Sequence, residues 1–117
     1  MSGTTLFILN EAPYGSERAY NALRLAGALS NIDGSKVRMF LMADAVACAK
    51  QGQKVPEGYY NIQLMLNKVI RTGELALCGT CMDARGFEAN DMLDGARRST
   101  LNELAQWTQE AEKVLVF

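Results

Sequence analysis

The sequence predicts an α/β fold in which helices cover both faces of a mainly parallel β-sheet, giving a three-layer sandwich. Short apolar runs typical of buried strands alternate along the chain with longer segments of helical periodicity. Strands that alternate with helices pair in parallel through right-handed crossovers. The 117 residues, 49% of them hydrophobic, suffice for one core. We find no linker, repeat or low-complexity segment in the sequence, so residues 1–117 are expected to form a single domain.

The first half of the chain contains two expected strand–helix pairs. Residues 4–10 form a short apolar run that predicts a strand, and residues 36–42 form a second. Between them, apolar residues spaced by three and four predict a helix within residues 14–29. After the second strand, Asp44 is a plausible N-cap for a helix that ends near Lys50.

The middle of the chain contains a loop, a helix and a strand. Residues 51–60 contain two glycines and a proline, which predicts a long loop. The apolar spacing that begins at Ile62 follows the helical period, and Gly73 is a natural stop for that helix. Residues 75–78 then form a third apolar run, which predicts a third strand.

The last third of the chain has weaker signals until residue 100. A short strand is expected at residues 95–98. Thr100 and Glu103 have the spacing of a capping box, which predicts the start of a helix. Residues 112–117 are apolar enough to form a final strand.

Composition narrows the classes of function. Twelve basic and thirteen acidic residues give a formal net charge of −1, so we expect no direct binding to nucleic acid. No apolar stretch approaches the roughly 20 residues needed to cross a membrane, and the N-terminus lacks the basic region of a signal peptide. Three cysteines, an odd number, fit a disulfide-stapled secreted domain poorly. We therefore expect a cytoplasmic protein with free thiols and no membrane attachment.

The loops that follow the first three strands are the predicted location of the functional site. In parallel sheets the ligand site lies beyond the carboxyl ends of the strands. Two cysteines and four polar or aromatic residues of these loops are therefore candidate site residues. They are Asn10, Tyr14, Asp44, Cys78, Cys81 and Arg85. Ordinary roles stay open for three of these residues: a turn at Tyr14, a helix cap at Asp44 and a solvated charge at Arg85.

Cys78 ends the third expected strand and is followed by the small residues Gly79 and Thr80. If a helix begins just after Cys78, free backbone N–H groups would point at its sulfur. Together with a cation such as Arg85, they would lower the pKa of the thiol and favour a nucleophilic thiolate. Cys78 can equally be a small buried residue at a strand end. Cys81 is either a resolving thiol or part of the wall of a pocket.

The Cys78–Cys81 spacing also occurs in disulfide exchangers and zinc sites. Zinc needs four ligands, whereas this chain has no histidine and no second pair with that spacing. Hydrolysis by a serine–histidine or cysteine–histidine pair is excluded by the same lack of histidine. We therefore expect no metal and no cofactor. Cys48, within an apolar helical segment, is expected in the core.

Several motifs in one order resemble the DsrE/DsrF family, and in particular its small YchN-like branch. The motifs are "APYGSERAYNALRLA", "FLMADAV", "GYYNIQLMLNKV", "LCGTCMDARG" and "ELAQWTQEAEKVLVF", which span nearly the whole chain. The resemblance implies an α/β sandwich that assembles into trimers or hexamers of stacked trimers. It also implies a persulfide on a cysteine that ends a strand several residues before an Arg-Gly, which is the place of Cys78. Cys81 matches the YchN-like branch but not the sulfur-relay members.

Three functions follow from these observations. The leading hypothesis is a sulfur-transfer protein with Cys78 as the sulfur acceptor and Cys81 as a possible resolving thiol. Its partners would be protein sulfur donors and acceptors, and the chain would form a homo-oligomer. An alternative is an oligomeric binding or regulatory protein whose pocket lies at subunit boundaries, with Asn10, Tyr14 and Asp44 contacting a small ligand. A third is a thiol–disulfide oxidoreductase.

Overall fold

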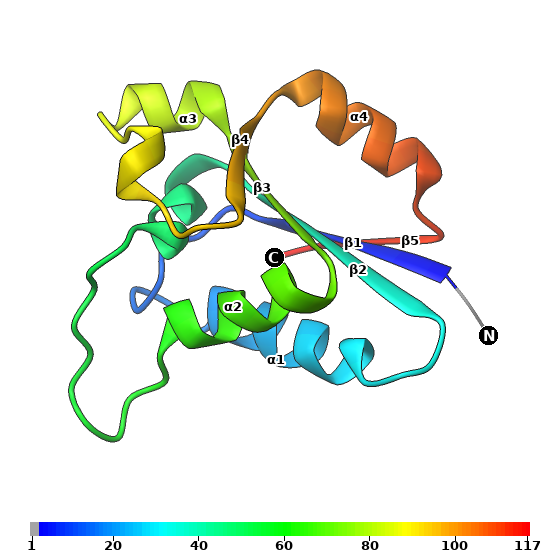
Figure 1. Cartoon of the computed structure of the whole chain (residues 1–117), viewed down its shortest axis with the longest axis horizontal. Coiled ribbons are helices and arrows are strands. Elements are labelled where there is room, and N and C mark those ends of the chain that lie inside the picture. The colour runs from blue at the N-terminus through cyan, green and yellow to red at the C-terminus, as the bar shows by residue number, and fades with distance from the viewer. Residues whose placement is uncertain (1–2) are drawn as a thin grey trace.

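Five parallel strands form one sheet in the computed structural model, which describes residues 3–117 (Figure 1). The strands are β1 (Gly3–Leu9), β2 (Ser35–Leu41), β3 (Glu74–Cys78), β4 (Ala96–Ser99) and β5 (Lys113–Val116). Their order across the sheet is β4-β3-β2-β1-β5, and every pairing is parallel. Each begins and ends within one residue of its expected range. The first two residues of the expected domain lie outside the described part of the chain.

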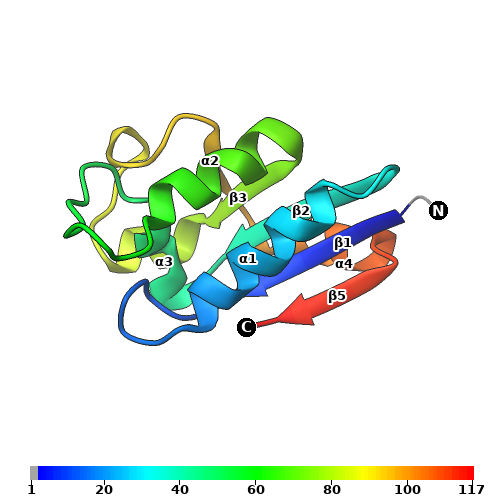
Figure 2. The same ribbon diagram turned by 90° about the horizontal axis from the view of Figure 1, so that it is seen from below.

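Helices lie on both faces of the sheet, so the predicted three-layer sandwich is confirmed. Helices α1 (Arg18–Ser30) and α2 (Ile62–Thr72) cover one face, and α4 (Leu101–Glu110) covers the other (Figure 1). Turned by 90°, the molecule shows α1 and α2 side by side (Figure 2). Three short helices complete the chain: η1 (Ala43–Ala49), α3 (Gly79–Ala84) and η2 (Ala89–Asp91). Within residues 3–117 no helix combines the length and the apolar character required for a membrane span.

Alternation along the strands divides the core into two unequal parts. Successive side chains of a strand point to opposite faces, so Phe7 and Met39 face α1 and α2 while Leu6 and Phe40 face α4. The larger cluster fills the space beneath α1, α2 and η1. The smaller one is closed by Leu104 and Trp107 of α4, with the Trp107 ring edge-on to Phe40 at 6.4 Å. The α4 layer is therefore the thinner of the two helical layers.

Two local expectations differ from the structure. Asp44 is not an N-cap: η1 is a 3₁₀-helix that begins at Ala43, and Asp44 lies in its first turn. The reason is that the Asp44 carboxylate binds a guanidinium on α3 instead of a backbone N–H. The capping box is half formed, because Thr100 accepts the Glu103 N–H at 3.2 Å while the Glu103 carboxylate pairs with Arg97.

Gly73, where α2 turns into β3, generates a test of this packing. A methyl group at Gly73 would lie 2.0 Å from the carbonyl oxygen of Val37 in β2. Gly73→Ala is therefore expected to lower the free energy of unfolding by about 1–3 kcal/mol through steric overlap. Urea denaturation measures the loss. Gly15→Ala is the matched control, since no atom lies within 4 Å of its added methyl group, and equal unfolding midpoints for the two variants would contradict the prediction.

Candidate functional site: two thiols at the end of β3

Cys78 is at once the last residue of β3 and the N-cap residue of α3. The conditional expectation of a helix immediately after Cys78 is thus confirmed. Its Sγ accepts a hydrogen bond from the Cys81 backbone N–H at 3.4 Å. The side chain is half-buried, forms no disulfide and contacts both hydrophobic clusters. Cys78 therefore stands where the two halves of the core meet at the carboxyl edge of the sheet.

Cys81 lies on the first turn of α3 and faces the segment that follows β2. Its Sγ accepts a hydrogen bond from the Ala43 backbone N–H at 3.2 Å. Ala43 has a φ of 50°, in the left-handed region that residues other than glycine rarely adopt. The strained turn at Ala43 thus directs a backbone donor at the second sulfur. Like Cys78, Cys81 is half-buried and carries a free thiol.

The pKa of the Cys78 thiol is raised above its ordinary value. Burial is the largest cause, and the adjoining Cys81 thiol is the next. The N–H groups of Cys81 and Thr80 act in the opposite direction but are outweighed. The expectation of a lowered pKa is therefore wrong for the resting protein, because loss of hydration at the sulfur exceeds the effect of the N–H donors.

Arg85 binds Asp44 and not the sulfur of Cys78. Its Nε and Nη2 atoms donate to Asp44 Oδ1 at 3.0 and 2.8 Å, and its Nη1 donates to the Cys81 carbonyl oxygen at 3.0 Å. The expected stabilisation of a Cys78 thiolate by Arg85 is thus not what this geometry provides. The guanidinium instead ties η1 to α3, and it holds in place the turn that carries Cys81.

Arg98 is the cation beside Cys78, and sequence reasoning missed it. It lies on β4, which pairs with β3 so that Cys78 is opposite Ser99. The guanidinium donates to both Asp83 carboxylate oxygens at 2.8 Å, and a methyl group on Gly79 would lie 2.9 Å from its Cζ. Asp83 raises the pKa of Arg98, and the charge of Cys78 adds to that effect. No sequence signal links Arg98 to Cys78; only strand pairing does.

Tyr14 lies in a different cluster, formed with the loop that precedes α2. Its φ is 70°, and its ring stacks on Tyr60 at a centroid distance of 4.7 Å. The Tyr14 hydroxyl donates to the Tyr60 carbonyl at 3.2 Å and accepts the Ile62 N–H at 3.1 Å. Tyr14 also lines an open cavity of about 510 Å³ together with Tyr20, Tyr59 and Tyr60. Tyr14 therefore holds two loops together at the rim of a cavity.

Asn10, the remaining candidate, lies at the same edge of the sheet, whereas Cys48 lies in the core. Asn10 follows β1, is exposed, and donates its backbone N–H to the Phe117 carbonyl at 3.0 Å. Cys48 is fully buried, as expected, and burial raises the pKa of its thiol to about 12. Across residues 3–117 no three cysteine or carboxylate side chains come together in a way that could hold a metal ion. The structure thus brings together Cys78, Cys81, Asp44 and Arg85, with Arg98 added.

Comparison with known sequences gives a family match over most of the chain. The DsrE/DsrF-like family matches residues 4–117. Protein YchN of Escherichia coli K12 is 50% identical over 119 aligned positions, which cover 96% of this chain and 97% of the relative. An uncharacterised protein of Methanopyrus kandleri is 36% identical over 110 positions, covering 94% of this chain and 90% of the relative.

Comparison with solved structures gives the same result for the fold. The crystal structure of the ychN protein from E. coli has a TM-score of 0.88 and 48% identity, with 100% of both chains covered. A protein of unknown function from Methanobacterium thermoautotrophicum has a TM-score of 0.76 at 11% identity, covering 99% of this chain and 100% of that one. The second likeness is one of fold alone.

The reactivity of Cys78 tests the electrostatics of the site. Because burial and Cys81 raise its pKa, alkylation of Cys78 at neutral pH is expected to be slower than that of an unstructured cysteine. The rate should rise with pH through a midpoint above the ordinary thiol value. Cys81→Ala removes the second thiol and is expected to lower that midpoint. Iodoacetamide labelling from about pH 6 to about pH 10, followed by peptide mass spectrometry, measures both curves.

Two arginine variants serve as a matched pair in the same experiment. Arg98→Gln removes a charge that favours the thiolate, so it should slow the alkylation of Cys78 at neutral pH. Arg85→Gln should change that rate far less, because Arg85 is directed at Asp44 and the Cys81 carbonyl, whereas Arg98 lies against Gly79, the residue that follows Cys78. Buried Cys48 is an internal reference that stays unlabelled. A midpoint below the ordinary value, or equal slowing in both variants, would contradict this description of the site.

Proposed function

Because the chain belongs to the DsrE/DsrF-like family, we propose that it is a small sulfur-transfer protein that carries sulfur as a persulfide on Cys78. One observation supports the choice of residue above the others. Cys78 is a free, half-exposed thiol at the end of β3, with a second thiol on the next helical turn. Buried Cys48 lacks the access that an incoming donor requires. Such a carrier operates in a reducing compartment such as the cytoplasm, where its thiols stay free.

Loading of Cys78 is an exchange between a thiol and a persulfide. The Cys78 thiolate attacks the outer sulfur of a donor persulfide, R–S–SH, on a donor protein. A bond forms between Cys78 Sγ and that outer sulfur while the S–S bond of the donor breaks. The donor leaves as a thiolate and takes up the proton that Cys78 released, so no external oxidant or reductant is consumed. The backbone N–H groups of Cys81 and Thr80 favour the anionic form of Cys78 during this step.

Unloading has two routes, which differ in the attacking thiol. An acceptor protein's thiolate attacks the outer sulfur, so the acceptor gains the sulfur and Cys78 returns as a thiol. Alternatively, the Cys81 thiolate attacks Cys78 Sγ, forming a Cys78–Cys81 disulfide and releasing the outer sulfur as hydrogen sulfide. In that route the two cysteines are oxidised while the released sulfur is reduced. A dithiol reductant is then needed to restore both thiols.

The polar residues of the site have supporting roles in this proposal. Arg85 and Asp44 fix the turn that presents Cys81, through the guanidinium contacts to Asp44 Oδ1 and to the Cys81 carbonyl. Asn10 and Tyr14 have no role in the exchange itself, and we place them at the surface that a partner meets.

Two other functions each have one supporting observation. The cavity of about 510 Å³ beside Tyr14 is of a size that suits a small ligand, as an oligomeric binding or regulatory protein would require. Tyr14 would then contact the ligand at a subunit boundary, whereas Asn10 and Asp44, which were also expected to contact it, do not line this cavity. The close placement of Cys78 and Cys81 equally suits a thiol–disulfide oxidoreductase, in which the pair cycles between thiols and disulfide.

Direct loading tests the proposed function. The reduced protein, treated with glutathione persulfide, is expected to gain the mass of one sulfur atom on Cys78. Cys78→Ser should abolish that gain, and Cys48→Ser should retain it. Cys81→Ser should hold the added sulfur longer, because the internal route of release is closed. Intact-protein and peptide mass spectrometry under non-reducing conditions give the yield and the position.

Other outcomes of the loading experiment contradict the proposal. Undiminished loading of Cys78→Ser would end it. A Cys78–Cys81 disulfide that cycles with thioredoxin-type reductants, without any gain of sulfur, would identify an oxidoreductase. If Cys78 neither gains sulfur from glutathione persulfide nor forms a disulfide that thioredoxin-type reductants reduce, the ligand-binding function is the one that remains.

We also propose that the chain assembles with itself into a trimer or a hexamer. The edge strand β5 supports this, because Val114 and Val116 are 38% and 66% exposed and pair in register with Leu6 and Ile8, which places them on the α4 face of the sheet. Sedimentation velocity is expected to give the mass of at least three chains. Val116→Lys should shift the distribution towards smaller species, since it places a charge among the exposed apolar side chains. A monomer at micromolar concentration for the unmodified chain would contradict the assembly.

A further inference from the structure

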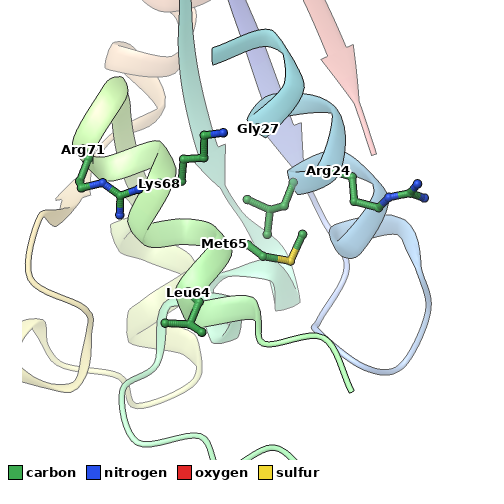
Figure 3. Close-up of a pocket in the computed structure, with 7 residues that line it drawn as sticks. Arg24, Gly27, Leu64, Met65, Lys68 and Arg71 are labelled. Carbon is green, nitrogen blue, oxygen red and sulfur yellow. The ribbon is translucent and has the colours of Figure 1, made fainter. Parts of the chain in front are cut away.

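A surface groove runs between α1 and α2, on the face of the sheet opposite α4. The two helices lie side by side (Figure 2), and the residues that line the groove between them are drawn in Figure 3. The groove has a volume of about 370 Å³. The residues that line it are Leu23, Arg24, Gly27, Leu64, Met65, Lys68 and Arg71. Both thiols lie outside this set, so the groove is separate from the site described above.

The floor of the groove is apolar. Met65 extends between the two helices, and Leu64 is 66% exposed (Figure 3). Gly27 leaves the facing surface of α1 open, since even a methyl group there would approach only the Lys68 side chain, at 3.9 Å. An exposed leucine beside a flexible methionine is typical of surfaces that bind other proteins.

The rim of the groove is basic, and its charge is not neutralised by this chain. Helices α1 and α2 contain no aspartate or glutamate. Arg24 and Lys68 donate to the neutral oxygens of Asn21 and Asn31, at 3.2 and 3.1 Å. Among residues 3–117, none of the ion pairs includes Arg24, Lys68 or Arg71. Three cations that form no ion pair among residues 3–117 therefore line one groove, in a protein whose net charge is −1.

The three cations come from both helices. Lys68 extends from α2 towards α1, whereas Arg24 extends to the outer side of α1 (Figure 3). Arg71 lies one helical turn beyond Lys68 on α2. A ligand that fills the groove thus meets Met65 and the Lys68 side chain between the two helices, with the Arg24 guanidinium on the outer side of α1.

We propose that the α1–α2 groove binds an acidic amphipathic helix of a partner protein. A groove between two adjacent helices accepts the side-chain ridge of a third helix, whose apolar stripe would contact Leu64 and Met65. Carboxylates beside that stripe would complement the three cations. Nucleic acid is a poorer fit, because the groove has no aromatic side chain on which a base can stack. Two copies of this chain facing each other through the groove would bring like charges together.

Defined peptides test this proposal without knowledge of the natural partner. One peptide of about 18 residues carries leucine at helical spacing with glutamate on both sides of that stripe. A second peptide of the same length carries lysine in place of glutamate. Fluorescence anisotropy with the full chain at low salt should show that the acidic peptide binds at least about ten times more tightly than the basic one. Its affinity should fall as salt is added.

Groove variants and a matched control identify the site of binding. The triple variant R24E/K68E/R71E is expected to weaken binding of the acidic peptide at least about tenfold and to gain affinity for the basic one. Leu64→Ser should weaken both, because it removes apolar contact without changing charge. The double variant K54E/K113E, which reverses exposed cations outside the groove, should bind like the unmodified chain. Circular dichroism confirms that each variant is folded.

Several results would overturn the proposal. Equal binding of the two peptides, or no binding of the acidic one, would exclude charge-selective docking. Retained affinity in R24E/K68E/R71E would place the binding elsewhere. If a single-stranded RNA binds through these residues and the acidic peptide does not, the groove is a nucleic-acid site. If instead the unmodified chain is an oligomer that binds no peptide, and R24E/K68E/R71E is a smaller species, a second copy of the chain occupies the groove.

Discussion

The geometry of the thiol site depends on β3 passing into α3 without an intervening residue. Cys78 is held by parallel pairing as the last residue of a strand, and in the same position it caps the helix that follows. Glycine is favoured at the next position, because a Cβ at Gly79 would lie 3.0 Å from the Ser99 carbonyl oxygen and 2.9 Å from Arg98, so that β4 and the Arg98 side chain would both have to shift. Strand pairing, helix start and thiol position are therefore fixed together, and none can move without the others.

That constraint sets two opposing influences on the Cys78 sulfur. Contact with both hydrophobic clusters removes water and raises the pKa, whereas backbone N–H groups and Arg98 favour the anion. The first influence dominates in the resting protein. A thiol that is mostly protonated at neutral pH oxidises more slowly than a thiolate, because the thiolate is the reactive form. In the proposed transfer reaction, this balance would keep Cys78 protonated until a sulfur donor reaches the carboxyl edge of the sheet.

Local patterns predicted the strands and the position of the cysteines, because each depends on neighbouring residues. The apolar run that ends at Cys78 and the helical spacing after Ile62 are signals of that kind. Local patterns did not predict the pairing of Arg85 with Asp44 or the approach of Arg98 to Gly79. Each of these contacts joins residues that are far apart in the sequence. Whether Cys78 was buried enough to change its pKa also depended on two core clusters assembled from the whole sheet. Sequence reasoning therefore placed both cysteines at the carboxyl edge of the sheet, but it did not foresee that Arg85 pairs with Asp44.

Cations on the two faces of the sheet differ in whether a carboxylate of the chain pairs with them, and this difference supports the proposal for the groove. On the α4 face, Arg38 lies 5.1 Å from the centre of the Trp107 ring and also pairs with Glu74 and Glu110. Its charge is matched within the chain and contributes to local packing. On the α1–α2 face, Lys68 is held only by the Asn31 amide oxygen, so its charge remains available. The chain as a whole has nearly balanced charge, so unpaired cations on one face make that face attractive to anions. Because the groove also exposes apolar side chains, the anion that fits it best is amphipathic.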